Sequence, residues 1–229
     1  MSMSRLQVLP LLLALSCLGC EAANGDSRQA ASGAGTERAE RAGRAGGPED
    51  VRAMAGEAYL GLVRSRVLPP EGSGIAGSRG SGSASAELQE SGRLVVVGNL
   101  ERDADAGFAA DGRFTEGGWQ SAGDGVELAI APDGSIQGGG VSGGNRMTIE
   151  GQLTRRKLDV FFEIELTSES AGGFPAGTRF QFGYELWRPY EAVQGNGDDP
   201  CREVVYRSKL VPNLSGGPMG LVQVPECRP

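Results

Sequence analysis

The sequence contains no histidine among its 229 residues. This absence excludes a Ser-His-Asp or Cys-His nucleophile, a histidine general base and every His-ligated metal site. Lysine is almost absent as well, since Lys157 and Lys209 are its two representatives, and the formal net charge is -7. An acidic chain with so little lysine is not typical of nucleic-acid binding or of electrostatic docking on anionic lipid.

Large apolar residues are also scarce. Leucine, isoleucine, valine and phenylalanine number 49 of 229, just above the floor of roughly 20% below which a chain cannot bury a core. They are unevenly distributed, because residues 20–92 hold 8 of them and residues 93–229 hold 33. The composition therefore predicts that the fold lies after residue 92.

The N-terminus has the features of an export signal. Arg5 precedes an apolar run over residues 6–18, which is too short to span a bilayer but has the length of a signal-peptide core. The run closes on Cys17-Leu18-Gly19-Cys20. This motif resembles the lipobox of bacterial lipoproteins, in which a small residue precedes the cysteine that receives the lipid.

The resemblance implies that residues 1–19 are a signal peptide and that Cys20 is acylated. It places the protein in the bacterial cell envelope, anchored to a membrane, with the outer membrane as the expected location and the inner membrane left open. Cys17 is a second candidate for lipidation. An ordinary cleaved signal without lipid is the alternative.

The two remaining cysteines, Cys201 and Cys227, are then the thiols of an exported chain, so we expect them to form a disulfide. Such a bridge contributes about 3 kcal/mol by restricting the unfolded state. Neither a Cys-x-x-Cys spacing nor a partner base favours metal binding or thiol catalysis. No catalytic residue, metal site or cofactor is expected.

Residues 20–47 consist mainly of Ala, Gly, Ser, Arg and Glu and offer too little apolar surface to offset the entropy of ordering, which predicts a disordered, lipidated tether. Residues 69–92 are rich in Gly and Ser, and this composition predicts a second linker. Between them, residues 48–68 carry apolar side chains at helical spacing and predict a short amphipathic helix. Its apolar stripe is Val51, Met54, Ala55, Ala58, Tyr59, Leu62 and Val63.

After residue 92 the apolar period changes to two, which is typical of strands with one buried face. The clearest strands are expected over residues 126–130, 147–153, 158–166 and 180–186. Weaker patterns predict strands over 93–100, 112–119, 135–140, 203–211 and 219–224. Turn signals such as Asp133-Gly134 and Gly195-Asn196-Gly197 separate them.

The spacing also predicts a register. A tight turn over residues 154–157 pairs Ile149 with Phe162, and a turn over residues 167–177 pairs Phe162 with Phe182, which gives a ladder of aromatic side chains on one face. On the other face Glu165 lies between Arg146 and Arg179, and these opposite charges pair favourably. One conflict is expected, because Asp159 faces Glu185.

Short sequential strands of this kind predict a mainly β fold over residues 93–229, an antiparallel up-and-down barrel of about eight strands, with a sandwich as the alternative. The segment from Gly118-Trp119 through Asp133-Gly134 to Gly151 resembles the meanders of small lipocalin-type and avidin-type barrels. That resemblance covers residues 118–151 and implies no ligand set.

Aromatic residues near strand ends are candidates for ligand or rim contacts at the mouth of a barrel. These candidates are Trp119, Tyr184, Trp187 and Tyr190. Two acidic pairs are alternative candidates. Glu163 and Glu165 share a strand face at a spacing that an acid-base pair could use, but that face is solvated. Asp198 and Asp199 could bind calcium, although adjacent turn acids are usually solvated.

These observations favour a membrane-anchored lipoprotein with a non-enzymatic β domain for envelope structure, protein contact or binding of a small apolar ligand. An inhibitor-type module is a second hypothesis, in which the segment over residues 48–68 enters an enzyme cleft. A carboxylate-dependent hydrolase is the third. A void lined by Phe162, Phe182 and Tyr184 would favour ligand binding, whereas a filled core would favour a scaffold.

Overall fold

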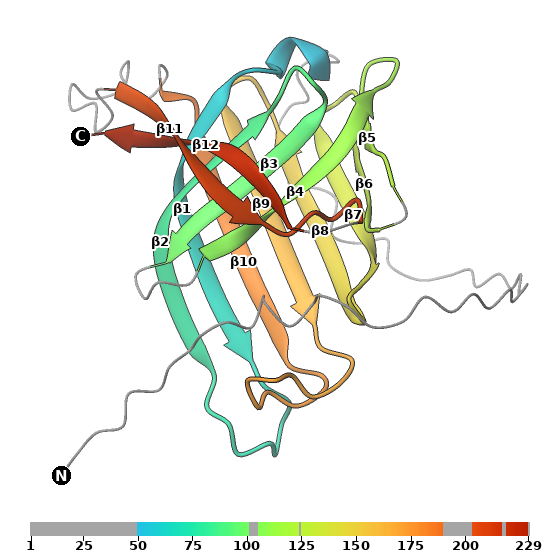
Figure 1. Ribbon diagram of the computed structural model, residues 1–229, viewed down its shortest axis with the longest axis vertical. Coiled ribbons are helices and arrows are strands. Elements are labelled where there is room, and N and C mark those ends of the chain that lie inside the picture. The colour runs from blue at the N-terminus through green and yellow to red at the C-terminus, as the bar shows by residue number, and fades with distance from the viewer. Residues whose placement is uncertain (1–49, 101–104, 124, 190–202, 217–218, 229) are drawn as a thin grey trace, which may run out of the picture.

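The protein folds as a closed antiparallel barrel of ten strands in a computed structural model that describes residues 50–100, 105–123, 125–189, 203–216 and 219–228 (Figure 1). Each strand pairs with its neighbours in sequence, and β1 pairs with β10 to close the ring. The barrel strands are β1 (Ala58–Leu68), β2 (Ser78–Leu88), β3 (Arg93–Leu100), β4 (Asp105–Phe114), β5 (Trp119–Ser121), β6 (Glu127–Ile130), β7 (Ser135–Ser142), β8 (Asn145–Leu153), β9 (Lys157–Glu165) and β10 (Arg179–Trp187).

The expected mainly β, up-and-down barrel is confirmed, with ten strands in place of about eight, and the sandwich alternative is wrong. Outside the barrel, β11 (Glu203–Val211) and β12 (Gly220–Arg228) form a two-stranded hairpin. A 3-10 helix over Val51–Met54 precedes β1. Among the described residues no helix is long and apolar enough to cross a bilayer.

The register expected from the alternation of apolar residues is confirmed. Ile149 lies opposite Phe162, and Phe162 lies opposite Phe182. Glu165 lies between Arg146 and Arg179, and its carboxylate forms an ion pair with Arg146 at 3.1 Å. The alternating apolar residues of these strands therefore face the barrel interior, whereas Phe161 and Trp187 lie on the outer face.

The expected conflict between Asp159 and Glu185 is present, because the two residues are directly opposite each other on the outer face. Lys157 resolves it: its ammonium group lies 3.0 Å from Asp159 and 3.2 Å from Glu185. The hydrogen bond to Asp159 raises the pKa of Lys157 against a smaller opposing effect of burial. One of the two lysines of the chain thus neutralises a like-charge pair on the sheet.

The helix expected over residues 48–68 is wrong. Residues 51–54 form a single 3-10 turn, capped by Asp50, and residues 58–68 form β1. Gly56 adopts φ +78°, a left-handed conformation that ends the turn. Tyr59 and Val63, both buried, are four residues apart, and a spacing of four fits one face of a helix as well as one face of a strand.

The linker expected over residues 69–92 is also wrong, because residues 78–88 form β2. Its inward positions carry small residues such as Gly80, Gly82 and Ala84, so the segment lacks the large apolar residues that mark a strand. A Cβ on Gly82 would lie 1.8 Å from the carbonyl oxygen of Asn99, which no side chain can do. Low hydrophobicity here reflects crowding inside the barrel, not disorder.

One further strand expectation needs correction. The segment over residues 112–119 is not one strand but the end of β4, a tight turn and the start of β5. The amide of Thr115 donates to the carbonyl of Gly118 at 2.9 Å, and Gly117 has φ +79°. A left-handed glycine is the residue that such a turn requires.

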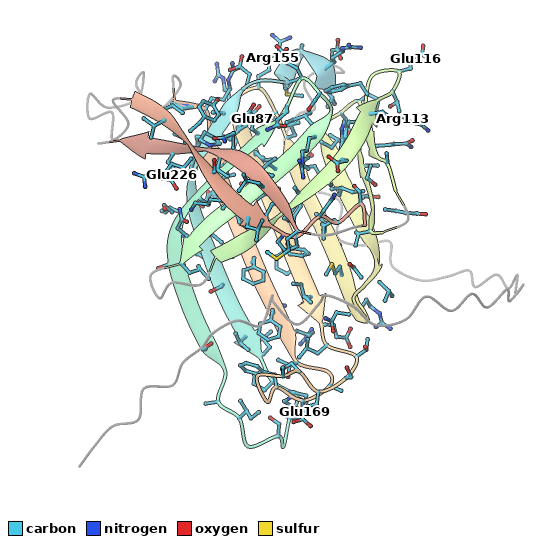
Figure 2. All side chains as sticks on the ribbon, in the orientation of Figure 1. Glu87, Arg113, Glu116, Arg155, Glu169 and Glu226 are labelled. Atoms are coloured by element: carbon cyan, nitrogen blue, oxygen red, sulfur yellow. The ribbon has the colours of Figure 1, made fainter. Side chains whose placement is uncertain are left out.

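The β11–β12 hairpin packs across the outside of the barrel and buries a second, smaller core. This core consists of Val95, Val97, Ala109, Val211, Val222 and Val224. Polar side chains at its edge include Tyr206, which lies near Glu87, and Figure 2 shows Glu87 beside the hairpin and Glu226 on β12. Burial raises the pKa of Glu87, and the interaction with Tyr206 offsets part of that rise.

The segment that joins the two hairpin strands completes the barrel wall. Strands β4 and β5 pair over three residues, and the segment over residues 212–215 fills the adjacent seam between β4 and the start of β6. The Leu214 amide donates to Ala109, and the Leu214 carbonyl accepts from Val126, at 2.8 and 2.7 Å. The Leu214 side chain is 1% exposed and belongs to the barrel core. A C-terminal segment is therefore part of the wall.

Replacing Leu214 with alanine should lower the free energy of unfolding by about 2–5 kcal/mol, because the change leaves a cavity in the barrel core. Leu221→Ala is the matched control, since Leu221 is 65% exposed on the hairpin and its truncation should change stability by no more than about 0.5 kcal/mol. Urea unfolding of both variants measures the difference. Equal effects would show that the segment does not seal the wall.

Candidate functional site

The two ends of the barrel differ. At the end where the 3-10 helix lies, Val51 and Met54 are fully buried and belong to the barrel core (Figure 1). Trp119 is also fully buried, and its indole nitrogen donates to the carbonyl of Gly92 at 2.7 Å. The Tyr59 hydroxyl donates to Thr154 at 2.8 Å. This end is closed by apolar packing and hydrogen bonds.

At the other end, below which the β1–β2 and β9–β10 connections lie in Figure 1, the inward side chains are half-buried. We refer to this region as the cup. Its members come from five adjacent strands, β3, β2, β1, β10 and β9. They are Ser65, Val67, Gly80, Leu100, Ile164, Phe180 and Phe182.

The strand register makes the cup continuous. Ser65 lies opposite Gly80 on one side and Phe182 on the other, and Val67 lies opposite Phe180. The serine hydroxyl faces the inside, since a Cβ on Gly80 would lie 2.7 Å from it. The cup residues carry no charge, so the surface that they offer is apolar with one hydroxyl.

Aromatic rings form the floor of the cup. The Phe162 ring is buried and lies 5.1 Å from the Phe108 ring and 6.0 Å from the Phe182 ring. At the rim, Phe174 of the β9–β10 connection packs edge-on against Phe180 at 5.3 Å. These distances are those of favourable aromatic pairs. The cup therefore has a rigid apolar floor and an aromatic wall.

Between the cup and the closed end, side chains fill the barrel interior. Phe162 and Tyr184 are 3% and 2% exposed and are packed within the main core, while Phe182 is partly exposed. No void lined by all three residues is found in the described part of the chain. The closed half of the barrel therefore has the filled core of a scaffold, whereas the open half presents partly accessible apolar side chains that a ligand could contact.

Tyr184 holds a buried hydroxyl in the interior. Within the described part of the chain this oxygen has no hydrogen-bond partner. Burial raises the pKa of Tyr184 well above its usual range, so the side chain stays a neutral phenol. A buried polar group without a partner lowers the stability of the fold. The Tyr184 hydroxyl is therefore a destabilising group in an otherwise apolar interior.

The structure does not bring the other candidate residues to the cup. Trp119 belongs to the closed end, as described above. Trp187 lies on the outer face, 38% exposed, with the ammonium group of Lys157 5.2 Å from the centre of its ring. Tyr190, Cys201 and Cys20 lie outside the described residues. Cys227 lies in β12 opposite Val204. The expected Cys201–Cys227 disulfide is not placed, because Cys201 is outside the described residues.

The acidic candidates have ordinary partners. Glu163 and Glu165 lie on the outer face of β9, where Glu163 accepts a hydrogen bond from Gln181 at 2.6 Å and Glu165 pairs with Arg146. Asp198 and Asp199 lie outside the described residues. Across the described ranges, no group of three or more Asp, Glu or Cys residues could hold a metal ion.

A shallow hollow of about 680 Å³ lies along β7 and β8. It is lined by residues 135–138 and 148–151, and none of the cup residues contributes to it. Gln137 and Glu150 are exposed there and lie directly opposite each other. Without a buried polar group or an aromatic wall, this hollow offers little to fix a ligand.

Sequence reasoning found one wall of the cup and missed the other. The aromatic wall on β9 and β10 follows from strict alternation of large residues. Ser65, Val67 and Gly80 were missed, because β1 and β2 were expected to be a helix and a linker. The signal was present in residues 79–87, where Gly80, Gly82, Ala84 and Ala86 alternate with larger or polar residues. Comparison of the chain with protein-family models, curated proteins and solved structures found no match.

Replacing Tyr184 with phenylalanine should raise the free energy of unfolding by about 1 kcal/mol, because the change removes a buried hydroxyl without a partner and leaves the ring in place. Thermal or urea unfolding measures it. Tyr59→Phe is the control, since the Tyr59 hydroxyl has a hydrogen bond and its loss should destabilise. A destabilised Tyr184→Phe variant would mean that the hydroxyl has a partner in solution.

Proposed function

We propose that the protein is a lipid-anchored component of the bacterial cell envelope, held by an acylated Cys20, whose barrel binds a small uncharged apolar molecule in the cup. The observation that carries the binding role is the asymmetry of the two barrel ends. One end is sealed by Val51, Met54 and Trp119, whereas the other leaves Phe180, Phe182 and Ile164 half-buried and facing inward. Small-ligand sites are lined mainly by apolar and aromatic side chains, and the cup offers such side chains in partly accessible form.

The chemistry of the cup sets the class of ligand. Its wall carries no charged group that would stabilise an ionised ligand, and transfer of a charge from water into apolar surroundings is costly. Flat or branched apolar groups would stack on the Phe182 ring and contact Val67. A polar group on such a ligand would form a hydrogen bond with the Ser65 hydroxyl.

The inhibitor hypothesis and the hydrolase hypothesis are less well supported. The inhibitor hypothesis relied on a free segment over residues 48–68, and most of that segment is β1, hydrogen-bonded on both sides within the wall. The hydrolase hypothesis relied on Glu163 and Glu165, which lie on the convex outer face. A binding module fits both observations better.

A role in protein contact is a second candidate, favoured by one feature of the hairpin. Leu210 and Leu221 lie opposite each other and are 53% and 65% exposed. This apolar pair lies on the hairpin face that points away from the valines packed on the barrel. It is separate from the cup, so the two roles are independent.

Acylation at Cys20 is tested by labelling cells with a fatty-acid probe. The wild-type protein should take up the probe and sediment with membranes, and Cys20→Ala should lose both properties. Cys17→Ala is the control and should remain labelled. Undiminished labelling of the Cys20 variant would refute the anchor at this position.

Ligand binding in the cup is tested with the uncharged fluorescent probe N-phenyl-1-naphthylamine. We expect the probe to brighten with the wild-type protein, and Val67→Trp, which places a large ring among the inward-facing residues of the cup, to weaken binding by about tenfold or more. Leu68→Trp is the matched control, because the adjacent residue faces outward and should leave the affinity unchanged. Equal affinity for all three proteins would contradict binding in the cup.

A further inference from the structure

Three arginines gather on the outer face of the barrel near its open end. Arg64 and Arg66 lie on β1 and Arg79 lies on β2, and all three are exposed. Arg66 and Arg79 are directly opposite each other in the β1–β2 ladder. We refer to these three residues as the arginine patch.

No compensating charge lies opposite the patch in the described strand ladders. Arg64 lies between Gly183 and Ser81, and Arg66 lies between Gln181 and Arg79, so no acid is directly opposite a patch arginine. Among the described residues none of the three arginines forms an ion pair. On the next strand, β9, Glu163 and Glu165 are already bonded to Gln181 and Arg146.

A cluster of arginines without acidic partners is suited to bind an anion from outside the protein. Like charges directly opposite in a ladder are destabilising, and a bound anion would remove that repulsion. The guanidinium group is planar and binds phosphate through two parallel hydrogen bonds. The surface above Gly183 is open, since a Cβ built there would meet no atom within 4 Å. A phosphate group therefore has both the charge and the room to approach Arg64.

The neighbourhood of the patch indicates where such phosphates come from. The β1–β2 connection, over residues 69–77, extends beyond the barrel at its open end (Figure 1) and carries the exposed side chain of Ile75. Glu71 is the acidic residue of that connection and offsets only part of the charge of three arginines. An apolar tip next to a basic surface matches the two layers of a bilayer interface, in which phosphates lie above acyl chains.

We propose that the arginine patch docks the open end of the barrel on the phosphate groups of an anionic bilayer. The chain as a whole is acidic, and the overall charge of -7 is not typical of such docking. The structure separates the charges, because the outer face of β1 and β2 near the open end has basic residues and no acid. Docking of this kind does not depend on the lipid at Cys20 or on a ligand in the cup.

The test uses the full chain with Cys20→Ser, so that no acyl chain contributes to membrane binding. Vesicles of phosphatidylcholine alone, or of phosphatidylcholine mixed with phosphatidylglycerol, are sedimented with the protein. We expect binding to the anionic vesicles that is reversed by salt and little binding to the neutral ones. Arg66→Gln and Arg79→Gln should each weaken it by about fivefold.

The control is Arg113→Gln, which removes the same charge from an exposed arginine at the closed end; Figure 2 shows Arg113 at the end of the barrel opposite Glu169. It should leave vesicle binding unchanged. Urea unfolding of each variant shows that the fold is retained. Equal binding to neutral and anionic vesicles, or equal loss in the Arg113 and Arg66 variants, would overturn the proposal.

Discussion

The ladder between β1 and β10 is the contact on which the rest of the molecule depends. It pairs residues from Leu60↔Trp187 to Leu68↔Arg179 and converts a curled meander with two open edges into a ring. Unpaired edges are sites of aggregation, and closure removes them. Closure also fixes the circumference of the barrel and so limits the volume available to side chains inside.

That limit explains why the interior mixes large rings with glycines. Where Phe108, Phe162 and Phe182 occupy the centre, facing strands carry the smallest residues. A Cβ at Gly98 would lie 2.8 Å from the Val63 side chain, and one at Gly138 would lie 2.7 Å from that of Leu128. Large and small side chains therefore complement each other across the interior.

The limited volume inside the barrel also determined which strands the sequence could predict. In β8, β9 and β10 large apolar residues alternate with mostly polar or charged ones, and this alternation was enough to predict the strands, their register and the Phe162–Phe182 pair of the candidate site. In β2 the inward positions are filled by Gly80, Gly82 and Ala84, and a strand made of small residues has the composition of a linker. The closing β1–β10 contact depends on residues too far apart in sequence for local patterns to indicate.

Two features that the sequence alone could not place together lie at the same end of the barrel. The cup opens there, and the arginine patch lies on the adjacent outer wall. If both proposals hold, the mouth of the cup faces the lipid headgroups, and an apolar ligand could pass between the bilayer and the cup without crossing water. Net charge and average hydropathy concealed this arrangement, because each averages over surfaces that the fold keeps apart.

The seam filled by residues 212–215 has a consequence for the order of folding. Each strand from β1 to β9 can pair with the next one as the chain emerges, but closure of the ring waits for β10, and the gap beside β4 waits for Leu214. Pairings between residues so distant in sequence are slow to form. A nascent or partly translocated chain that ends before this segment therefore keeps an unsatisfied edge, and is the species most in need of a chaperone.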